Sequence, residues 1–566
     1  MRRRAQAKSA PGRAVLRGGQ PMRQHRTMGN ALYYGDNLDV LREHVRDESV
    51  DLIYLDPPFN SNATYNVLFR APAGKQSEAQ IEAFADTWHW GDSAARAFDE
   101  VLRSRHTAAA SMLRAMRSFL GENDMMAYLA MMAVRLIELH RVLKSTGSLY
   151  LHCDPTASHY LKILMDGIFD GQFRAEIVWK RSSAHSDAKQ GRREFGHIHD
   201  IIFFYSMGAS WKWNNIYTLY SEQYLKDFYR HVDPTTGRRY RLSDMTGPGG
   251  LAKGNPSYEV MGVTRFWRYT EAKMEKLIAS GRVHQSKAGS VPQEKRFLDE
   301  MKGVPLQDVW VDVPPISPVA AERLGYPTQK PLALLERIIE ASSNEGDVVL
   351  DPFCGCGTAV HAAEKLKRQW IGIDITHLAV SLIERRLKDA FPAVEFEVHG
   401  TPRDLDGARD LAARDKYQFQ WWAVSLVDAV PQGGKKKGAD RGIDGIRWVR
   451  NGPREGDVKQ VLVSVKGGEH VTSAMVRDLK GTVEREGAAA GLFITLAEPT
   501  REMQREAAAT GFFESGFGRH PRMQIFTIRE LLAGMKPDLP PLGRTEGFRR
   551  APRERGPKPI QDAMDL

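Results

Sequence analysis

Short apolar runs and amphipathic stretches alternate over the first 400 residues of the chain. Five apolar runs have the length and composition of buried strands: 50–55, 148–152, 198–205, 348–350 and 370–373. Between several of them, apolar residues at helical spacing predict helices, such as those over 126–143 and 332–341. This alternation predicts an α/β fold with a doubly wound sheet.

The alternation changes at two places, which divides the chain into segments. One stretch is rich in glycine, proline and aromatic residues, and another is short, polar and rich in Arg and Asp. The predicted segments are a basic disordered arm (1–28), a first half of the α/β domain (29–205), an inserted module (206–315), a second half (316–400), a linker (401–416), a further α/β domain (417–536) and a disordered tail (537–566).

Composition narrows the class of protein. With 42% hydrophobic and 27% charged residues, the chain has the make-up of a soluble globular protein. No apolar run approaches the ~20 residues that cross a bilayer, so no membrane partner is expected. The chain has only three cysteines, which suits a reducing compartment and predicts a cytoplasmic location.

The net charge of +10 lies almost entirely in the arm. Of the 80 Lys and Arg residues, eight fall within 1–28, which contains no acid, so the other 72 face 70 Asp and Glu. The arm could bind phosphates, or it could be a disordered leader or the result of an upstream start-codon choice. Global charge therefore says little about the folded body.

The first candidate site follows the strand-like run at 50–55. The run ends in Asp56, Pro57, Pro58 and Phe59. Prolines cannot continue a central strand, so the acid is presented at a strand's carboxyl end, where open α/β sheets place ligands. An Asp-Pro turn can also be purely structural, and this motif alone leaves both interpretations open.

The second candidate site follows the run at 348–350. There Asp-Pro-Phe-Cys-Gly-Cys-Gly-Thr (351–358) leads into a helix, and the next strand ends at Asp374. The glycines let the backbone approach a ligand closely, and the helix N-terminus offers free N–H groups. The turn lacks the lysine of a triphosphate-binding P-loop. By analogy with dinucleotide folds, Asp374 can hold ribose hydroxyls, and the series predicts a nucleotide-type cradle.

Four motifs in this order resemble the amino-group DNA methyltransferases that use S-adenosylmethionine. Asp-Pro-Pro-Phe (56–59) is similar to their catalytic tetrad, and the segment 351–358 is similar to their cofactor loop. Gly-Asp-Asn-Leu (35–38) and Thr-Gln-Lys-Pro (328–331) resemble two further motifs of the family. The tetrad comes first, as in the permuted β-class. The resemblance covers about residues 29–400 and implies a Rossmann-like methyltransferase fold with the insert as target-recognition region.

The resemblance also implies a role for each motif residue. The implied catalytic residues are Asp56, Pro57, Pro58 and Phe59. The implied cofactor-binding residues are Asp36, Thr328, Lys330, Asp351, Phe353, Gly355, Gly357, Thr358 and Asp374. Hydrogen bonds from an exocyclic amino group to Asp56 and the Pro57 carbonyl would aim the nitrogen at the methyl donor, and Phe59 would stack on the flipped base. No metal is needed for this chemistry.

The methylated base and the cysteines follow from the same motifs. By resemblance, Asp at the first tetrad position favours adenine N6, while cytosine N4 enzymes more often carry Ser. Carbon-5 methylation needs a cysteine nucleophile in a different motif, and Cys153, Cys354 and Cys356 are expected to be packing residues.

The inserted module has the composition of a nucleic-acid surface. Residues 201–270 contain 15 aromatic side chains. Basic residues interleave with them: Lys212, Lys226, Arg230, Arg238, Arg239, Arg241, Arg265 and Arg268. Such mixtures can grip phosphates and stack on bases, although a small aromatic core with a solvated basic rim is the alternative.

The segment 417–536 resembles the Mrr-like branch of the PD-(D/E)XK nucleases. Asp444 and Lys466 match the family pattern and would bind Mg²⁺ and activate water. Ser464 stands where the family carries an acid or Gln, and Glu469 or Glu484 could replace that ligand. An inactive DNA-binding remnant is the alternative.

The expected function is methylation of adenine N6 in double-stranded DNA, in a restriction-modification setting. S-Adenosylmethionine is the expected cofactor, with Mg²⁺ at Asp444 for the nuclease-like domain. Cytosine-N4 methylation, a Mg²⁺-dependent endonuclease with a regulatory methyltransferase part, and a non-catalytic DNA-binding module are the alternatives. RNA is a further possible substrate, and the oligomeric state stays open, with a homodimer as one possibility.

Overall fold

The structure is a computed structural model of the protein. It describes residues 29–58, 64–70, 76–85, 89–182, 193, 195–317, 320–326, 328–432, 442–454, 457–541 and 551–554. The predicted arm at 1–28 lies outside these residues.

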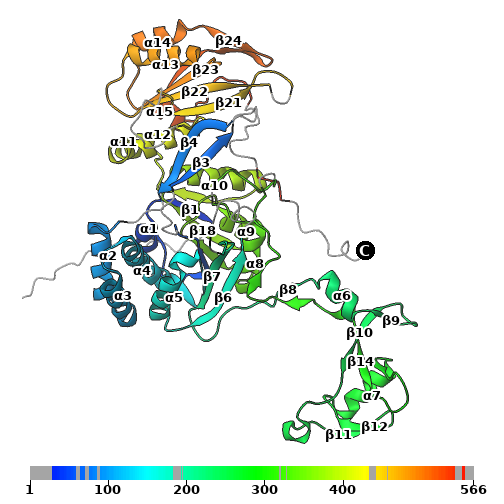
Figure 1. Ribbon diagram of the computed structural model, residues 1–566. Coiled ribbons are helices and arrows are strands. Elements are labelled where there is room, and N and C mark those ends of the chain that lie inside the picture. The colour runs from blue at the N-terminus through cyan, green and yellow to red at the C-terminus, as the bar shows by residue number, and fades with distance from the viewer. Residues whose placement is uncertain are drawn as a thin grey trace, which may run out of the picture.

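A nine-stranded sheet forms the centre of the first domain (Figure 1). Its strands are β1 (Ala31–Tyr34), β2 (Val50–Leu55), β5 (Leu143–Cys153), β6 (Phe173–Lys180), β7 (His199–Ser206), β16 (Val309–Trp310), β17 (Val348–Asp351), β18 (Gln369–Asp374) and β19 (Glu397–His399). Their order is β16-β6-β7-β5-β2-β17-β18-β1-β19. All neighbours run parallel except β7, which is antiparallel to β5 and β6.

Helices cover both faces of this sheet. One layer contains α1 (Asn37–His44), α2 (Asp92–Arg103), α3 (Thr107–Leu120), α4 (Asp124–Val142) and α5 (Pro155–Ile168), and the other contains α8 (Leu332–Ser342), α9 (Thr358–Lys365) and α10 (His377–Ala390). Ile53 and Leu55 pack into the core between the sheet and the layer of α1 to α5, whereas Leu52 and Tyr54 pack into the core on the side of α8 to α10. This alternation along β2 is the sheet's period of two, and it makes the strand apolar throughout.

The order of strands brings together two strand ends that are far apart in the sequence. β2 and β17 are parallel neighbours, with Leu52 opposite Val349 and Ile53 opposite Leu350. β17 in turn lies beside β18, so Asp56, Asp351 and Asp374 stand at the carboxyl ends of three adjacent strands. A hairpin of β3 (Thr64–Arg70) and β4 (Gln76–Ala85) follows β2 along the chain.

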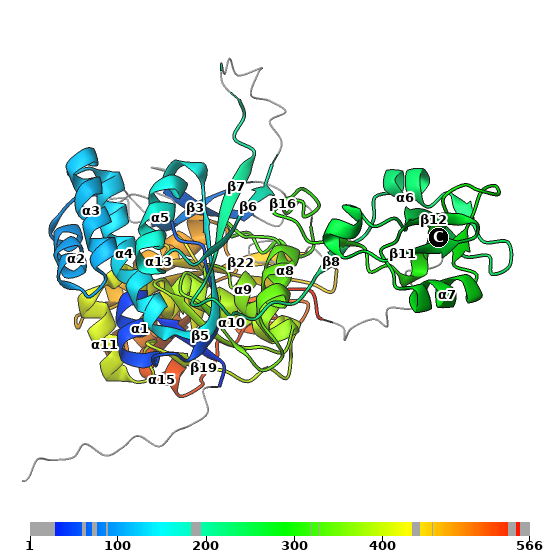
Figure 2. The same ribbon diagram turned by 90° about the horizontal axis from the view of Figure 1, so that it is seen from below.

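The inserted module projects from the body of the first domain (Figures 1 and 2). It contains β8 (Tyr217–Thr218), α6 (Glu222–Phe228), β9 (His231–Val232), β10 (Arg239–Asp244), η2 (Gly250–Lys253), β11 (Ser257–Val260), β12 (Val263–Phe266), α7 (Glu271–Ala279), β13 (Val283–His284), β14 (Gln293–Phe297), η3 (Leu298–Glu300) and β15 (Val304–Pro305). A small core of Met245, Val260, Trp267 and Met274 holds its outer part together. The predicted insert ended at residue 315, but β16 already pairs with β6 in the main sheet.

The C-terminal domain is a separate α/β unit. It contains α11 (Leu405–Arg414), α12 (Lys416–Ser425), β20 (Val430–Pro431), β21 (Gly445–Arg450), β22 (Val458–Lys466), α13 (Ser473–Arg485), β23 (Ala490–Thr495), α14 (Arg501–Ala508), β24 (Phe512–Ser515), β25 (Gly518–Pro521), β26 (Met523–Thr527) and α15 (Ile528–Leu532). Its main sheet has the order β20-β21-β22-β23-β26. Among the helices of the described residues, none is both long and apolar enough to cross a membrane.

Two segments depart from the sequence-based division. The expected linker at 401–416 contains α11, because Asp404 caps the helix by accepting the Gly407 N–H and because Ala408 and Leu411 lie on one buried face. In the predicted disordered tail, residues 551–554 pack on the first domain, where Ala551 joins a buried cluster. Glu554 accepts a hydrogen bond there, its Oε1 lying 3.1 Å from the His361 Nε2.

Candidate active site

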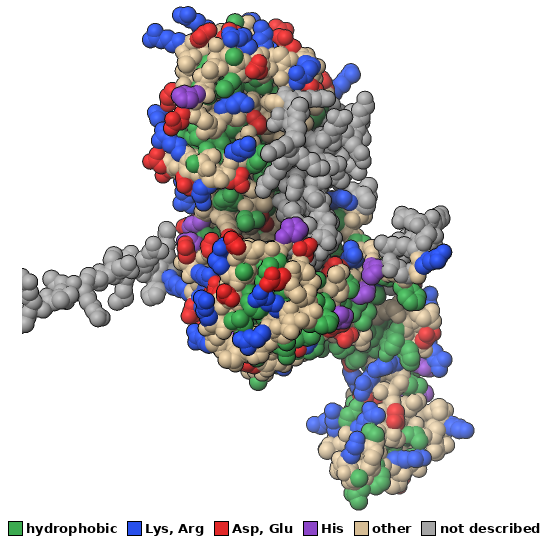
Figure 3. Space-filling model, turned by 60° about the vertical axis from the view of Figure 1, so that its left-hand side comes forward, with side chains coloured by type: hydrophobic (Ala, Val, Ile, Leu, Met, Phe, Trp, Pro, Cys, Tyr) green, Lys and Arg blue, Asp and Glu red, His purple; other side chains and the backbone are tan. Residues whose placement is uncertain are grey.

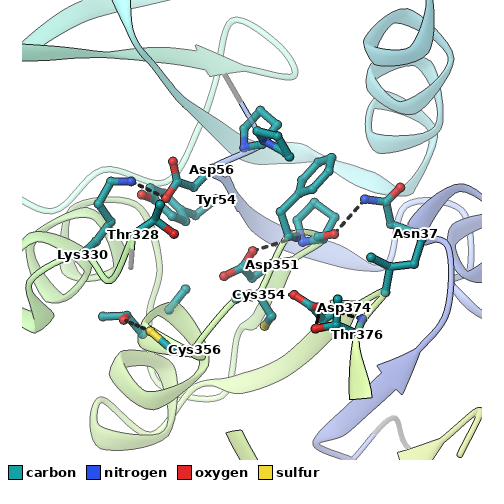
Figure 4. Close-up of a pocket in the computed structure, with 18 of the residues that line it drawn as sticks. Asn37, Tyr54, Asp56, Thr328, Lys330, Asp351, Cys354, Cys356, Asp374 and Thr376 are labelled. Carbon is teal, nitrogen blue, oxygen red and sulfur yellow. Dashed lines mark hydrogen bonds and ion pairs between the residues drawn. The ribbon is translucent and has the colours of Figure 1, made fainter. Parts of the chain in front are cut away.

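A cavity of about 350 Å³ lies at the carboxyl ends of β2, β17 and β18 (Figure 4). Eleven of the residues predicted to be catalytic or cofactor-binding line it: Asp36, Asp56, Pro57, Pro58, Thr328, Lys330, Asp351, Phe353, Gly355, Thr358 and Asp374. Gly357 is not among the lining residues, and Phe59 is outside the described residues. The structure therefore brings all four motifs to one cavity.

The Asp56 carboxylate forms an ion pair across the cavity wall. The Lys330 Nζ lies 2.5 Å from the Asp56 Oδ2, and both side chains are largely buried. Sequence reasoning placed Lys330 among the cofactor-binding residues, whereas its side chain contacts the predicted catalytic acid. The pair occupies one of the two carboxylate oxygens of Asp56.

The loop after β17 is shaped by two glycines in the left-handed region. Gly355 has φ of +52° and Gly357 has φ of +75°. A Cβ at Gly357 would lie 2.8 Å from the Ile383 Cγ1, so no other residue fits without a shift. The Gly355 N–H donates to the Asp374 Oδ2 at 2.8 Å, which joins the loop to the end of β18.

Burial and mutual repulsion raise the pKa values of two carboxyl groups in the cavity. Burial raises the pKa of Asp351 to about 8, with further repulsion from Asp56 and Asp374. Burial also raises the pKa of Asp374 to about 6, although N–H donors from Thr376 and Gly355 oppose that shift. A ligand that brings positive charge and hydroxyl or amino donors would relieve both effects.

Two residues for which no role was predicted, Asn37 and Arg135, connect Asp36 with the loop after β17. Asp36 accepts from the Arg135 Nη2 at 2.9 and 3.0 Å, and Arg135 also donates through Nε to the Asn37 Oδ1. The Asn37 Nδ2 donates to the Pro352 carbonyl at 2.8 Å. Arg135 interrupts a run of nine apolar residues, 126–134, in the predicted helix over 126–143, and a charge at this place was a signal that could have found it.

The three cysteines are buried and free. Burial, reinforced by nearby carboxylates, raises the pKa of the Cys153 and Cys354 thiols well above the ordinary value. A thiol in this state is a poor nucleophile. Their environment fits packing residues.

The basic residues of the insert differ in availability. On the face seen in Figure 3, the module shows Lys and Arg side chains and few acidic ones. Arg238 pairs with Asp299 and Glu300, and Lys212 pairs with Asp51 and Asp347 at the amino ends of β2 and β17. The exposed members of the predicted set are Lys226, Arg230, Arg239, Arg265 and Arg268.

The nuclease-like position of the C-terminal domain is organised differently. The Asp444 Oδ2 accepts the Val465 N–H at 2.7 Å, so this carboxylate braces the neighbouring strand. Ser464 is only 3% exposed, and Glu469 and Glu484 are exposed. Among the described residues, no three His, Cys, Asp or Glu side chains are grouped so as to hold a metal ion. The predicted Mg²⁺ site at Asp444 and Lys466 is therefore not supported.

The fold is a Rossmann-like α/β sheet with a cavity beside a strand-end carboxylate. The chain belongs to the DNA methylase family (N6_N4_Mtase), which it matches over residues 50–385. Residues 433–533 match the NACHT-associated inactive Restriction Endonuclease 1 family, whose description gives no support to an additional endonuclease activity.

Curated relatives agree with the family. The chain is 32% identical to the Type II methyltransferase M.EcaI of Enterobacter cloacae over 46% of this chain and 57% of the relative. It is 28% identical to the Type III restriction-modification enzyme StyLTI Mod subunit of Salmonella typhimurium over 61% of this chain and 51% of the relative. The chain thus spans about half the length of these relatives.

A more distant relative and one solved structure complete the comparison. The DNA adenine methyltransferase YhdJ of Escherichia coli is 25% identical over 63% of this chain and 82% of the relative. The crystal structure of the M1.HpyAVI–SAM complex is 14% identical and covers 63% of this chain and 98% of its own, with a TM-score of 0.30.

Proposed function

We propose that the protein transfers a methyl group from S-adenosylmethionine to the N6 amino group of adenine in double-stranded DNA, within a restriction-modification system. The observation that carries this proposal is the meeting of Asp56 and the glycine loop at one cavity. The family membership supports amino-group methylation, and two of the relatives described above are named for adenine methylation and restriction-modification. We propose adenine rather than cytosine as the methylated base because an Asp, Asp56, stands at the first tetrad position.

The residues of the cavity fit S-adenosylmethionine. The volume of the cavity is in the range of small-molecule sites. The buried Asp351 and Asp374 are suited to the ammonium group and the ribose hydroxyls, and a Cβ at Gly355 would narrow the cradle at Tyr326. Asp36, Thr328, Phe353 and Thr358 would complete the wall, with Gly357 setting the loop conformation. S-Adenosylmethionine supplies an electrophilic methyl group and a neutral thioether as leaving group.

The chain's own contribution is positioning. An adenine amino nitrogen is a weak nucleophile because its lone pair is delocalised into the ring. The Asp56 oxygen that Lys330 leaves free and the Pro57 carbonyl would accept its two N–H groups and direct the lone pair toward the methyl carbon. On receiving the methyl group that S-adenosylmethionine would supply, the nitrogen would give up one of these N–H protons to solvent. Pro58 would rigidify the segment, and Phe59 would stack on the extruded base.

The inserted module would select the DNA sequence, through its exposed arginines and lysines on phosphates and its aromatic rings on bases. A homodimer and a cytoplasmic location stay predictions.

The test is methylation of plasmid DNA by the full chain with tritiated S-adenosylmethionine. Digestion to nucleosides and mass spectrometry then identify the product. N6-methyladenine is the expected product. Detection of N4-methylcytosine instead would show that cytosine is the target. Label found only in added RNA would show that RNA is the substrate. Cofactor binding without any labelled product would reduce the chain to a DNA-binding module.

A further inference from the structure

A chain of three buried polar side chains runs across the main sheet beside the cavity. The Tyr54 hydroxyl lies 2.9 Å from the His152 Nδ1, and the His152 Nε2 lies 3.1 Å from the Asp200 Oδ2. The three residues come from the neighbouring strands β2, β5 and β7, and none is more than 3% exposed. The mechanism proposed above does not involve these three residues.

The carboxylate at one end sets the direction of these hydrogen bonds. Burial opposes the charge of Asp200, yet the hydrogen bond from His152 and the nearby charges of Lys330 and Arg181 hold its pKa below the usual value. An ionised carboxylate only accepts, so His152 donates through Nε2. In the tautomer that carries its proton on Nε2, the Nδ1 has the lone pair and accepts the Tyr54 O–H.

This direction turns the Tyr54 proton away from the cavity. Tyr54 is part of the cavity wall, together with Asp56 and Asp351 (Figure 4). Burial and these carboxylates raise the pKa of Tyr54 well above the usual value, which keeps it a neutral phenol. Its oxygen retains lone pairs for a group in the cavity, and with the O–H committed to His152, those lone pairs can only accept.

We propose that Tyr54 recognises the sulfonium group of the methyl donor through its phenolic oxygen, with His152 and Asp200 as positioning residues that hold the hydroxyl in the accepting orientation. The inference rests on the proposed function, because Asp56 marks the end of the cavity where methyl transfer would occur. An oxygen acceptor is favourable beside a sulfonium cation and its polarised methyl group. It has no such preference for the neutral thioether of the product.

The test compares binding of S-adenosylmethionine and S-adenosylhomocysteine to the full chain by calorimetry. Tyr54→Phe should weaken S-adenosylmethionine about three- to tenfold and change S-adenosylhomocysteine less than about twofold. An equal loss for both ligands, or no loss, overturns the inference. If the unaltered chain binds neither ligand, the proposed function fails instead.

A second variant tests the positioning residues. His152→Leu should lower the affinity for S-adenosylmethionine relative to S-adenosylhomocysteine, and it should add nothing to that ratio in a Tyr54→Phe background. Additive effects would show that His152 does not act through Tyr54. Tyr150→Phe is the matched control, because Tyr150 is the register partner of Tyr54, bonds Ser342 at 2.7 Å and lies outside the cavity wall. It should leave the ratio unchanged.

Discussion

The two α/β domains of this chain both present an aspartate next to a sheet strand, but the carboxylate has different surroundings in each. In the first domain, Asp56, Asp351 and Asp374 end three adjacent parallel strands and face one cavity. In the C-terminal domain, one carboxylate oxygen of Asp444 accepts the Val465 N–H. Ser464 is buried at the position where a metal-binding acid would be needed. The neighbours of such an acid, rather than the acid alone, therefore decide what its carboxylate contacts.

The largest expected effect separates these two aspartates directly. Asp56→Asn keeps the size of the side chain but removes the charge that pairs with Lys330 and one acceptor for the amino group. Methyl transfer should fall about 100- to 1000-fold, with cofactor affinity changed far less. The measurement is tritium transfer to DNA together with calorimetric binding.

Asp444→Asn is the matched control for Asp56→Asn. An amide oxygen can still accept the Val465 N–H, so methyl transfer should equal that of the unaltered chain. Near-normal transfer by Asp56→Asn, or a comparable loss in Asp444→Asn, would abolish the distinction between the domains.

A second comparison uses one glycine from each domain. Gly357→Ala forces a side chain into a left-handed position and against Ile383, which should distort the loop after β17. Affinity for S-adenosylmethionine should fall about 10- to 100-fold. A Cβ at Gly468 would meet no atom within 4 Å, so Gly468→Ala should bind S-adenosylmethionine with unchanged affinity. Equal affinity in the two variants would mean that the loop conformation does not matter for the ligand.

Much of the first domain could be predicted because its signals are local. The apolar runs at 50–55 and 348–350 coincide with β2 and β17, and the motif residues after them line the cavity. Pairings between distant side chains carry no such signal. Asn37 and Arg135 are 98 residues apart, as are Tyr54 and His152, so only the fold reveals their contacts.

Other features of the structure went beyond what the sequence could predict. Lys330 lines the cavity, as its motif suggests, and its ammonium group also pairs with the Asp56 carboxylate, so its assignment to the cofactor stays a prediction. The polar segment 401–416 contains a helix because a few buried positions outweigh many charged ones. A tail rich in Pro and Arg still docks at residues 551–554, since Glu554 meets His361 and Lys365.

A smaller effect concerns the pH dependence of cofactor binding. The pKa of Asp351 is raised to about 8, so this carboxyl is mostly protonated at pH 7 in the free protein. A cationic ligand favours the ionised form, and binding should therefore release protons. Affinity should rise with pH between about 6 and 8, by at most about tenfold per unit, and level off above.

Calorimetry in buffers of different ionisation enthalpy counts the released protons. Asp351→Asn should bind more weakly and lose the proton release. A flat affinity over this pH range in the unaltered chain would show that Asp351 is already ionised or does not meet the cation.

The smallest expected effect is that of Mg²⁺ on the C-terminal domain. A site with a Kd of about 1 mM would stabilise this domain by about 1.4 kcal/mol at about 10 mM Mg²⁺, which corresponds to a rise in Tm of several degrees. Because Asp444 braces the backbone and Ser464 offers no carboxylate, we expect no shift in the full chain's melting curve and no cutting of supercoiled plasmid. A rise in Tm that disappears in Asp444→Asn would establish a metal site after all, and would make the two domains alike in chemistry as well as in fold.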